Sequence, residues 1–231
     1  MILKNYKTSY GKVTIFVMGK NEISETSSLN PEETRICANN FFNIPLENIY
    51  LLKQVHGDKS WNTSEIESGS LPEGDALYSA KEKEILIIKT ADCMPLFFWS
   101  ESRPLIGAVH SGWKGALSGI SEKLFLKLNE NSGYSETFGG YLGPCIRMKS
   151  YEVSLDLAER FGNEYPECIN FLNGKYYLGL DSFLKFRMKK NDIKINIDDC
   201  EICAKENSAF YSHRAKDSGR NLNGIYMERN I

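Results

Sequence analysis

Hydrophobic and polar positions along the chain follow two periods, and each period predicts one kind of element. Short apolar runs bounded by turn residues predict strands, whereas apolar positions three or four residues apart predict helices. Strands are expected over 12–17, 49–55, 76–80, 84–90, 94–100, 104–110, 138–144, 176–180, 193–197 and 223–227. Helices are expected over 31–43, 113–128, 151–161 and 181–190, the first with Asn30 as N-cap and Pro31 as first helical residue.

The predicted strands cluster in the middle of the chain, often with no helix between them. This order favours an α+β fold, with a mixed β-sheet core and helices packed on it, over a strict βαβ repeat. No internal repeat or long Pro/Gly/Ser-rich linker divides the sequence, so residues 1–231 are expected to form a single domain. A domain of this size buries roughly 70% of its unfolded surface and needs no disulfide or metal merely to fold.

Charge and hydropathy exclude several classes of protein. The chain has 28 basic and 30 acidic residues, a net charge of −2, so no nucleic-acid partner is expected. The longest apolar run is "MPLFFW", far short of the roughly 20 residues that span a bilayer, so no membrane association is expected. No targeting segment is recognisable, which predicts a cytoplasmic protein whose six cysteines are mostly reduced and buried.

Three side chains that bind metals follow predicted strands. His56 follows "IYLLKQV", Cys93 follows "EILIIKTAD", and His110 ends "PLIGAVH". Two imidazoles and one thiolate match a catalytic zinc site, which keeps its fourth position for water or substrate. Two other interpretations stay open: a buried core thiol with structural histidines, or a metal-independent Cys–His hydrolase or amidase with Cys93 as nucleophile.

Other residues suggest an anion or redox site. "HSGWKG" opens a predicted helix, where exposed N–H groups and Lys114 favour a phosphate. The loop "YSHRAKDSGRN" carries His213, Arg214 and Arg220, and guanidinium groups bind phosphate with two parallel donors. "CEIC" holds Cys200 and Cys203 without a second CxxC, so a structural role is expected for both.

Seven segments together resemble one family. "KQVHG", "GDAL", "TADCMPLFF", "AVHSGWKG", "LGPCI", "YEV" and the closing "FYSHR…SGR" stand in the order seen in the bacterial laccase-domain (multicopper polyphenol oxidase-like) family. The resemblance implies a zinc site formed by His56, Cys93 and His110. It also implies the α+β fold shared with cysteine-hydrolase-like toxin domains.

The resemblance further implies a purine nucleoside phosphorylase with additional adenosine deaminase activity. Adenosine, inosine, guanosine and methylthioadenosine are the substrate class, with phosphate as co-substrate. Lys53, Lys114 and Arg220 are then candidates to bind phosphate. Cys93, Asp92 and Asp75 are candidate catalytic residues, with either aspartate as proton shuttle during deamination. Zinc is the expected metal and copper the other candidate, but three histidines cannot build the several copper centres of a multicopper oxidase.

Overall fold

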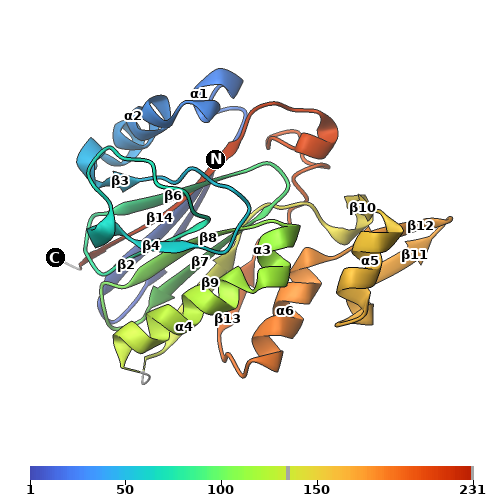
Figure 1. Cartoon of the computed structure of the whole chain (residues 1–231). Coiled ribbons are helices and arrows are strands. Elements are labelled where there is room, and N and C mark those ends of the chain that lie inside the picture. Colours follow the sequence, from blue (N-terminus) through green and yellow to red (C-terminus); the bar gives the residue numbers. More distant parts are fainter. Residues whose placement is uncertain (134–135, 230–231) are drawn as a thin grey trace.

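Two large sheets make up most of the computed structural model, which describes residues 1–133 and 136–229 (Figure 1). The first has the order β1 (Ile2–Lys7), β2 (Gly11–Met18), β14 (Asn221–Arg229), β6 (Ile85–Thr90) and β3 (Ile49–Tyr50). The second has the order β13 (Asn196–Asp199), β9 (Phe138–Leu142), β7 (Met94–Ser100), β8 (Ile106–Ser111), β5 (Ala76–Ser79) and β4 (Ser60–Asn62). A small third sheet has the order β10 (Glu152–Val153), β12 (Lys175–Leu178) and β11 (Ile169–Leu172).

Helices connect and cover these strands. The α-helices are α1 (Glu25–Leu29), α2 (Pro31–Phe42), α3 (Trp113–Ser118), α4 (Ile120–Ser132), α5 (Leu155–Gly162) and α6 (Leu180–Lys190). Short 3₁₀ helices are η1 (Leu46–Asn48), η2 (Thr63–Glu65), η3 (Met148–Ser150), η4 (Pro166–Cys168) and η5 (His213–Ala215). Most strand pairs are antiparallel, but β3–β6, β4–β5 and β9–β13 are parallel. The predicted mixed α+β fold is confirmed; its likeness to toxin domains stays a prediction.

The two large sheets share a core that their alternating side chains build. Leu86 and Ile88 of β6 face Phe97 and Trp99 of β7, whereas Ile85 and Ile87 point to the opposite face. Helix α2 covers that opposite face, and α4 and α6 cover the outer face of the second sheet (Figure 1). Strand β7 is therefore buried on both faces, which explains its continuous apolar sequence.

Four predicted elements differ clearly from those observed. The strand expected over 193–197 lies further along the chain, at Asn196–Asp199. The strand expected over 49–55 is a strand only at Ile49–Tyr50, because the chain then leaves the sheet and Lys53 forms an isolated bridge with Glu73. The helix expected over 113–128 is divided at Gly119, whose φ of 73° lies in the left-handed region. The helix expected over 151–161 begins only at Leu155, where the Ser154 side chain accepts a hydrogen bond from the Leu157 amide.

Several short elements carried too little periodic signal to be predicted. They are β1, β4, β11 and α1, the last only five residues long. Among the described residues, no helix combines the length and the apolar character needed to cross a membrane.

Candidate active site

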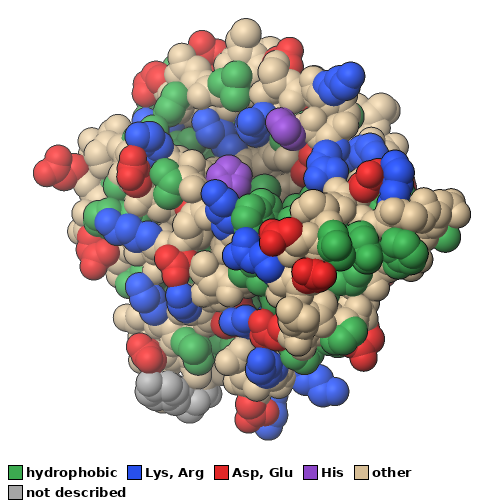
Figure 2. Space-filling model, turned by 45° about the vertical axis from the view of Figure 1, so that its right-hand side comes forward, with side chains coloured by type: hydrophobic (Ala, Val, Ile, Leu, Met, Phe, Trp, Pro, Cys, Tyr) green, Lys and Arg blue, Asp and Glu red, His purple; other side chains and the backbone are tan. Residues whose placement is uncertain are grey.

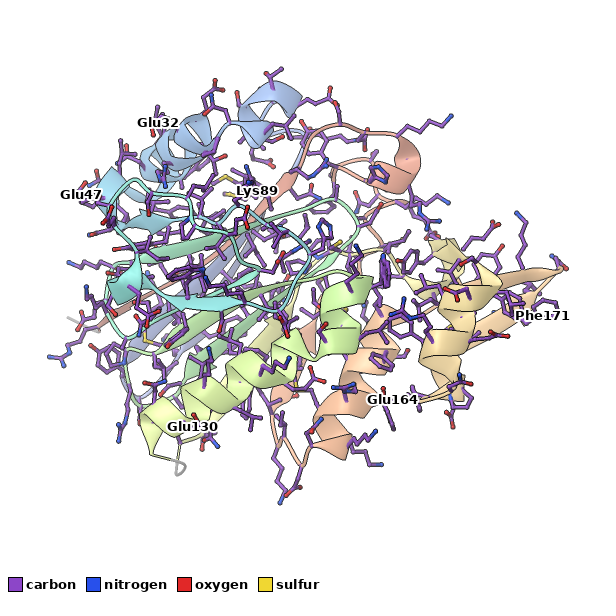
Figure 3. All side chains as sticks on the ribbon, viewed as in Figure 1. Glu32, Glu47, Lys89, Glu130, Glu164 and Phe171 are labelled. Atoms are coloured by element: carbon purple, nitrogen blue, oxygen red, sulfur yellow. The ribbon has the colours of Figure 1, made fainter. Side chains whose placement is uncertain are left out.

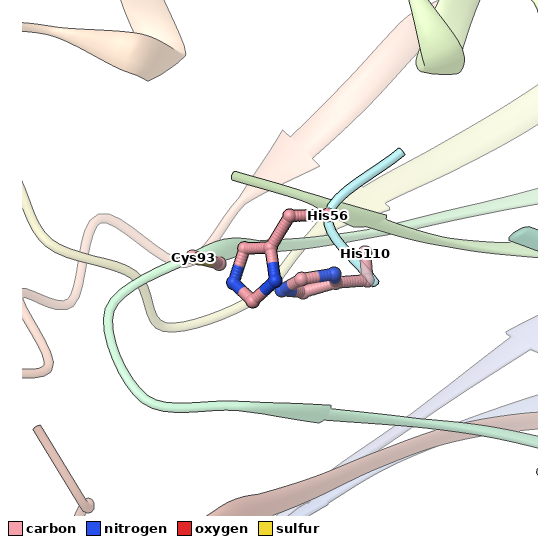
Figure 4. A group of neighbouring side chains, drawn as sticks. All are labelled: His56, Cys93 and His110. Atoms are coloured by element: carbon pink, nitrogen blue, oxygen red, sulfur yellow. The ribbon is translucent and has the colours of Figure 1, made fainter. Parts of the chain in front are cut away.

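His56, Cys93 and His110 converge from three separate segments (Figure 4). His56 lies in the loop after β3 with a φ of 59°, and Cys93 follows Asp92, whose φ of 91° turns the chain between β6 and β7. His110 lies on β8, opposite Pro95 of β7. The ligand atoms of the three side chains all lie within 4.8 Å of one another, and ligands of one tetrahedral zinc ion lie about 3.3–3.6 Å apart, so a small shift of the side chains would bring them to those distances. The three residues are thus close enough to share a metal ion.

A buried carboxylate holds two members of this cluster in place. Asp75, which is 0% exposed, lies 2.8 Å from Nδ1 of His110 through its Oδ1 atom. Its oxygens also accept hydrogen bonds from the backbone amides of His56, at 3.0 Å, and Gly57, at 2.7 Å. Because Nδ1 of His110 donates to Asp75, Nε2 is the ring nitrogen left to bind a metal.

The absence of a side chain at Gly112 leaves room for the side chains of Cys93 and His56. A Cβ atom at this position would lie 3.0 Å from Sγ of Cys93 and 3.1 Å from Cδ2 of His56. Both distances are shorter than ordinary van der Waals contact, so a side chain here would require Cys93 and His56 to shift by a few tenths of an ångström. Gly112 thus lets the backbone pack closely against the cluster.

The cluster also favours the thiolate form of Cys93. Burial by itself would raise the pKa of this thiol, but hydrogen bonds from His110 and His56 and their charges lower it to about 6. Burial would lower the pKa of His110, yet the contacts with Asp75 and Cys93 raise it to about 9. A thiolate is the form that binds metals and attacks electrophiles.

A cavity of about 670 Å³ opens over the cluster and takes in His56, Cys93 and His110. A volume of this size is typical of small-molecule sites. Figure 2 shows a hollow on this face with histidine, lysine and arginine side chains around it. Trp113 and Tyr151 provide aromatic walls. The cavity can therefore hold a flat ring and a negatively charged group together.

The two candidate aspartates lie on different sides of the cluster. Asp92 lines the cavity, and its carboxylate accepts hydrogen bonds from Oγ of Ser212, at 2.7 Å, and the amide of Arg214, at 2.8 Å. These contacts fasten the loop that carries His213 and Arg214 over the site. Asp75 lies behind His110, outside the cavity lining.

The three residues that are candidates to bind phosphate differ in their positions relative to the cavity and in their contacts. Lys53 lines the cavity, but it is largely exposed and its Nζ lies 2.9 Å from Glu73. Lys114 is exposed outside the cavity lining, with its Nζ 5.5 Å from the centre of the Trp113 ring. Arg220 lines the cavity, and its Nη1 donates to the carbonyls of Ser218 and Gly219.

Sequence patterns do not identify several residues that line the cavity. Among them are Lys89, Gln54 and Tyr151. Lys89 lies near the end of the apolar strand β6 (Ile85–Thr90). A lysine in this position usually indicates only that the strand reaches solvent there. Burial raises the pKa of Tyr151 to about 12, so its hydroxyl stays a hydrogen-bond donor at neutral pH. For Tyr151 the "YEV" segment was the available signal.

Cys200 and Cys203 lie apart from this cavity. Burial raises the pKa of Cys200, and Cys203 is buried beside Cys145 in an isolated parallel bridge. Neither thiol lines the main cavity. Their surroundings are those of structural cysteines rather than of reactive ones.

Comparisons with known proteins find relatives over most of the chain. A protein of Clostridium acetobutylicum named purine nucleoside phosphorylase is 31% identical over 188 residues, which cover 78% of this chain and 76% of that protein. A Rickettsia conorii protein of the same name is 27% identical over 184 residues, covering 78% of this chain and 73% of that protein.

Solved structures share the fold. A Neisseria meningitidis protein superposes with a TM-score of 0.78 at 21% identity and covers 98% of this chain and 99% of that chain. A Geobacillus stearothermophilus protein superposes with a TM-score of 0.74 at 24% identity, covering 84% and 79%. The family model described as multi-copper polyphenol oxidoreductase laccase matches residues 18–228. The resemblance seen in the sequence is thereby confirmed, and the chain belongs to the multi-copper polyphenol oxidoreductase laccase family.

Proposed function

We propose that this chain is a zinc-dependent purine nucleoside phosphorylase with a second, adenosine deaminase activity. The observation that carries the proposal is the His56–Cys93–His110 cluster inside a cavity that also has aromatic walls and basic side chains. The relatives named purine nucleoside phosphorylase support the same reaction class. Adenosine, inosine, guanosine and methylthioadenosine are the proposed nucleosides.

The donor set fits zinc. One thiolate and two imidazoles are borderline ligands that suit this ion, and the cavity leaves room for a further ligand. When bound, zinc would polarise a substrate oxygen or lower the pKa of a water molecule to about 7. Asp75 would orient His110 and increase its basicity as a ligand.

In phosphorolysis, different residues of the cavity would contact the purine base and the phosphate. A phosphate oxygen forms a bond to C1′ of the ribose while the C1′–N9 bond breaks, and the bonding electron pair leaves with the purine, which takes up a proton. Trp113 and Tyr151 would flank the flat base, and the Tyr151 hydroxyl, protonated at neutral pH, would donate a hydrogen bond to the departing base. Arg220 would hold the phosphate.

Deamination needs a carboxylate near the attacking water. Of the two candidates only Asp92 lines the cavity, so we propose Asp92 as the proton carrier and Asp75 as the group that positions His110. The metal-independent hydrolase would use the same Cys93 and His110, but no relative described above carries such a name.

The test is a product analysis. Purified zinc-loaded protein is incubated with adenosine, inosine, guanosine and methylthioadenosine, with and without phosphate, beside Cys93→Ala. We expect free base and ribose 1-phosphate (or its methylthio form) only with phosphate, inosine from adenosine without it, and neither from the variant. Absence of phosphate-dependent base release from all four nucleosides would refute the phosphorylase assignment, and undiminished turnover by zinc-free protein would refute the zinc requirement.

A further inference from the structure

Lys89 lies on β6, and Arg220 is the residue directly before β14, the neighbouring strand. Lys89 pairs in register with Leu222 of β14, and Thr90 pairs with Asn221. The register therefore brings the backbone of Arg220 close to the end of β6 that carries Lys89. Both side chains line the cavity that contains the metal-ligand cluster. Figure 3 shows Lys89 on the side of the molecule where α1 and α2 run.

No carboxylate neutralises either cation among residues 1–133 and 136–229, where each finds only uncharged acceptors. Nζ of Lys89 donates to the carbonyl of Leu29 at 3.3 Å. Nη1 of Arg220 donates to the carbonyls of Ser218, at 2.7 Å, and Gly219, at 2.8 Å. Like charges near each other repel, and an anion between them would remove that repulsion.

The ionisation of Lys89 reflects this crowding. Burial lowers the pKa of Lys89, and the positive charge of Arg220 lowers it further. A partly buried lysine beside an arginine is unfavourable for folding, because two positive charges repel each other and are partly removed from water. An anion bound between them would relieve this cost, and the relief would favour binding.

Hydrogen bonds fix the backbone of both residues. The Gln54 side chain accepts a hydrogen bond from the Lys89 amide at 2.7 Å and donates one to its carbonyl at 2.8 Å. The amide of Arg220 donates to Oγ of Ser28 at 2.8 Å, and Glu25 of α1 accepts from the amides of Ser218 and Gly219. Preorganised donors bind an anion with less loss of conformational entropy.

We propose that Lys89 and Arg220 together form the phosphate clamp of the cavity, with Lys89 rather than Lys53 or Lys114 as the lysine that contacts the phosphate. The inference rests on the proposed function, because it places the co-substrate of phosphorolysis. Lys53 already pairs with Glu73, and Lys114 lies outside the cavity lining. Arg220 supplies a planar set of donors and Lys89 a point charge, a combination suited to an inorganic phosphate or to the phosphate of ribose 1-phosphate.

The experiment measures binding of inorganic phosphate to zinc-loaded protein by calorimetry, without nucleoside. Lys89→Met removes the charge at similar length, and Lys194→Met, at a highly exposed lysine outside the cavity, is the matched control. We expect Lys89→Met to bind phosphate at least roughly tenfold more weakly, with unchanged zinc content and a melting temperature no lower than that of wild type, and Lys194→Met to bind like wild type. Lys89→Arg should recover part of the affinity.

Equal phosphate affinity in wild type and Lys89→Met would overturn the clamp. It would also be overturned if a nucleoside 5′-monophosphate lost affinity in Lys89→Met while inorganic phosphate did not, since the pair would then recognise a nucleotide. The binding assay stands whether or not phosphorolysis is found. If phosphorolysis is found, an unchanged KM for phosphate in Lys89→Met removes Lys89 from the site and leaves the proposed function intact.

Discussion

The Nδ1 atom of His110 lies 2.8 Å from Oδ1 of Asp75, and the same carboxylate accepts hydrogen bonds from the backbone amides of His56 and Gly57. One buried group thus fixes the ring of one candidate ligand and the backbone of another. Those contacts keep the pKa of Asp75 below its usual value despite burial, which by itself would raise it. The carboxylate is therefore ionised at neutral pH and able to orient both segments.

Asp75→Asn should weaken zinc binding by roughly 10- to 100-fold, because the amide cannot replace a carboxylate that accepts from the imidazole and two amides. Competition with a chromophoric zinc chelator measures the affinity. Asp58→Asn, at an exposed carboxylate that pairs with Lys123, is the control and should bind zinc like wild type. An unchanged zinc affinity in Asp75→Asn would show that His110 needs no such partner.

Gly112→Ala should lower zinc occupancy, because the added methyl group meets Sγ of Cys93 and Cδ2 of His56 at close to 3 Å. The matched control is Gly162→Ala, where the nearest atom is a methylene carbon of Ile169 at 3.5 Å. Metal analysis of both purified variants checks this expectation. Full zinc occupancy in Gly112→Ala would mean that the cluster adapts to the extra volume.

The thiol of Cys93 should react with iodoacetamide in metal-stripped protein with an apparent pKa of about 6. The thiolate is the reactive form, so the alkylation rate rises as the pH increases through 6 and levels off above 7. Mass spectrometry of the labelled peptide follows the rate across pH. Adding zinc should suppress labelling, whereas a midpoint near pH 8.5 would contradict the described contacts with His56 and His110.

Arg220→Lys should raise the phosphate concentration required for phosphorolysis by roughly tenfold, because lysine cannot offer two parallel donors. Deamination of adenosine needs no phosphate and should fall much less. Steady-state kinetics at varied phosphate concentration separate the two reactions, and metal analysis should show normal zinc. A parallel loss of both activities with unchanged phosphate dependence would make Arg220 a structural residue of the loop.

Replacing Cys200 and Cys203 together by serine should leave zinc content and nucleoside turnover within a few-fold of wild type. Both thiols lie outside the cavity lining, and burial keeps Cys200 protonated. Circular dichroism confirms folding before activity is compared. Loss of turnover in a folded, zinc-loaded variant would show a role for the CxxC segment that its position does not suggest.

Sequence patterns predicted β2, β6 and β7, because short, largely apolar runs between turn residues are typical of strands that are buried almost throughout. The segment 49–55 misled the same reasoning. Leu51 and Leu52 are buried like strand residues, but the Gln54 side chain makes the two hydrogen bonds to Lys89 that a paired backbone would otherwise make. Hydropathy does not distinguish a strand that pairs with β6 from a loop whose side chain makes the hydrogen bonds to the backbone of β6.

The same limit applies to the site. His56, Cys93 and His110 stood out because few residue types bind metals and each follows an apolar run. Lys89 did not, because its meaning depends on the strand register that brings it beside Arg220, and that register joins segments far apart in the chain. The sequence identifies Asp75 only as a candidate carboxylate in "GDAL". Its position behind His110 depends on the pairing of β5 with β8.

The strand order of the first sheet also governs when the protein can fold. Strand β14 lies between β2 and β6, so those two strands have no shared neighbour until Asn221–Arg229 has been synthesised. A nascent polypeptide still on the ribosome therefore exposes the apolar faces of β2 and β6. Folding that depends on such distant pairings is slow and leaves the chain open to aggregation. Completion of this sheet, and with it of the wall that carries Lys89 and Arg220, therefore depends on the pairing of β14 with strands far earlier in the chain.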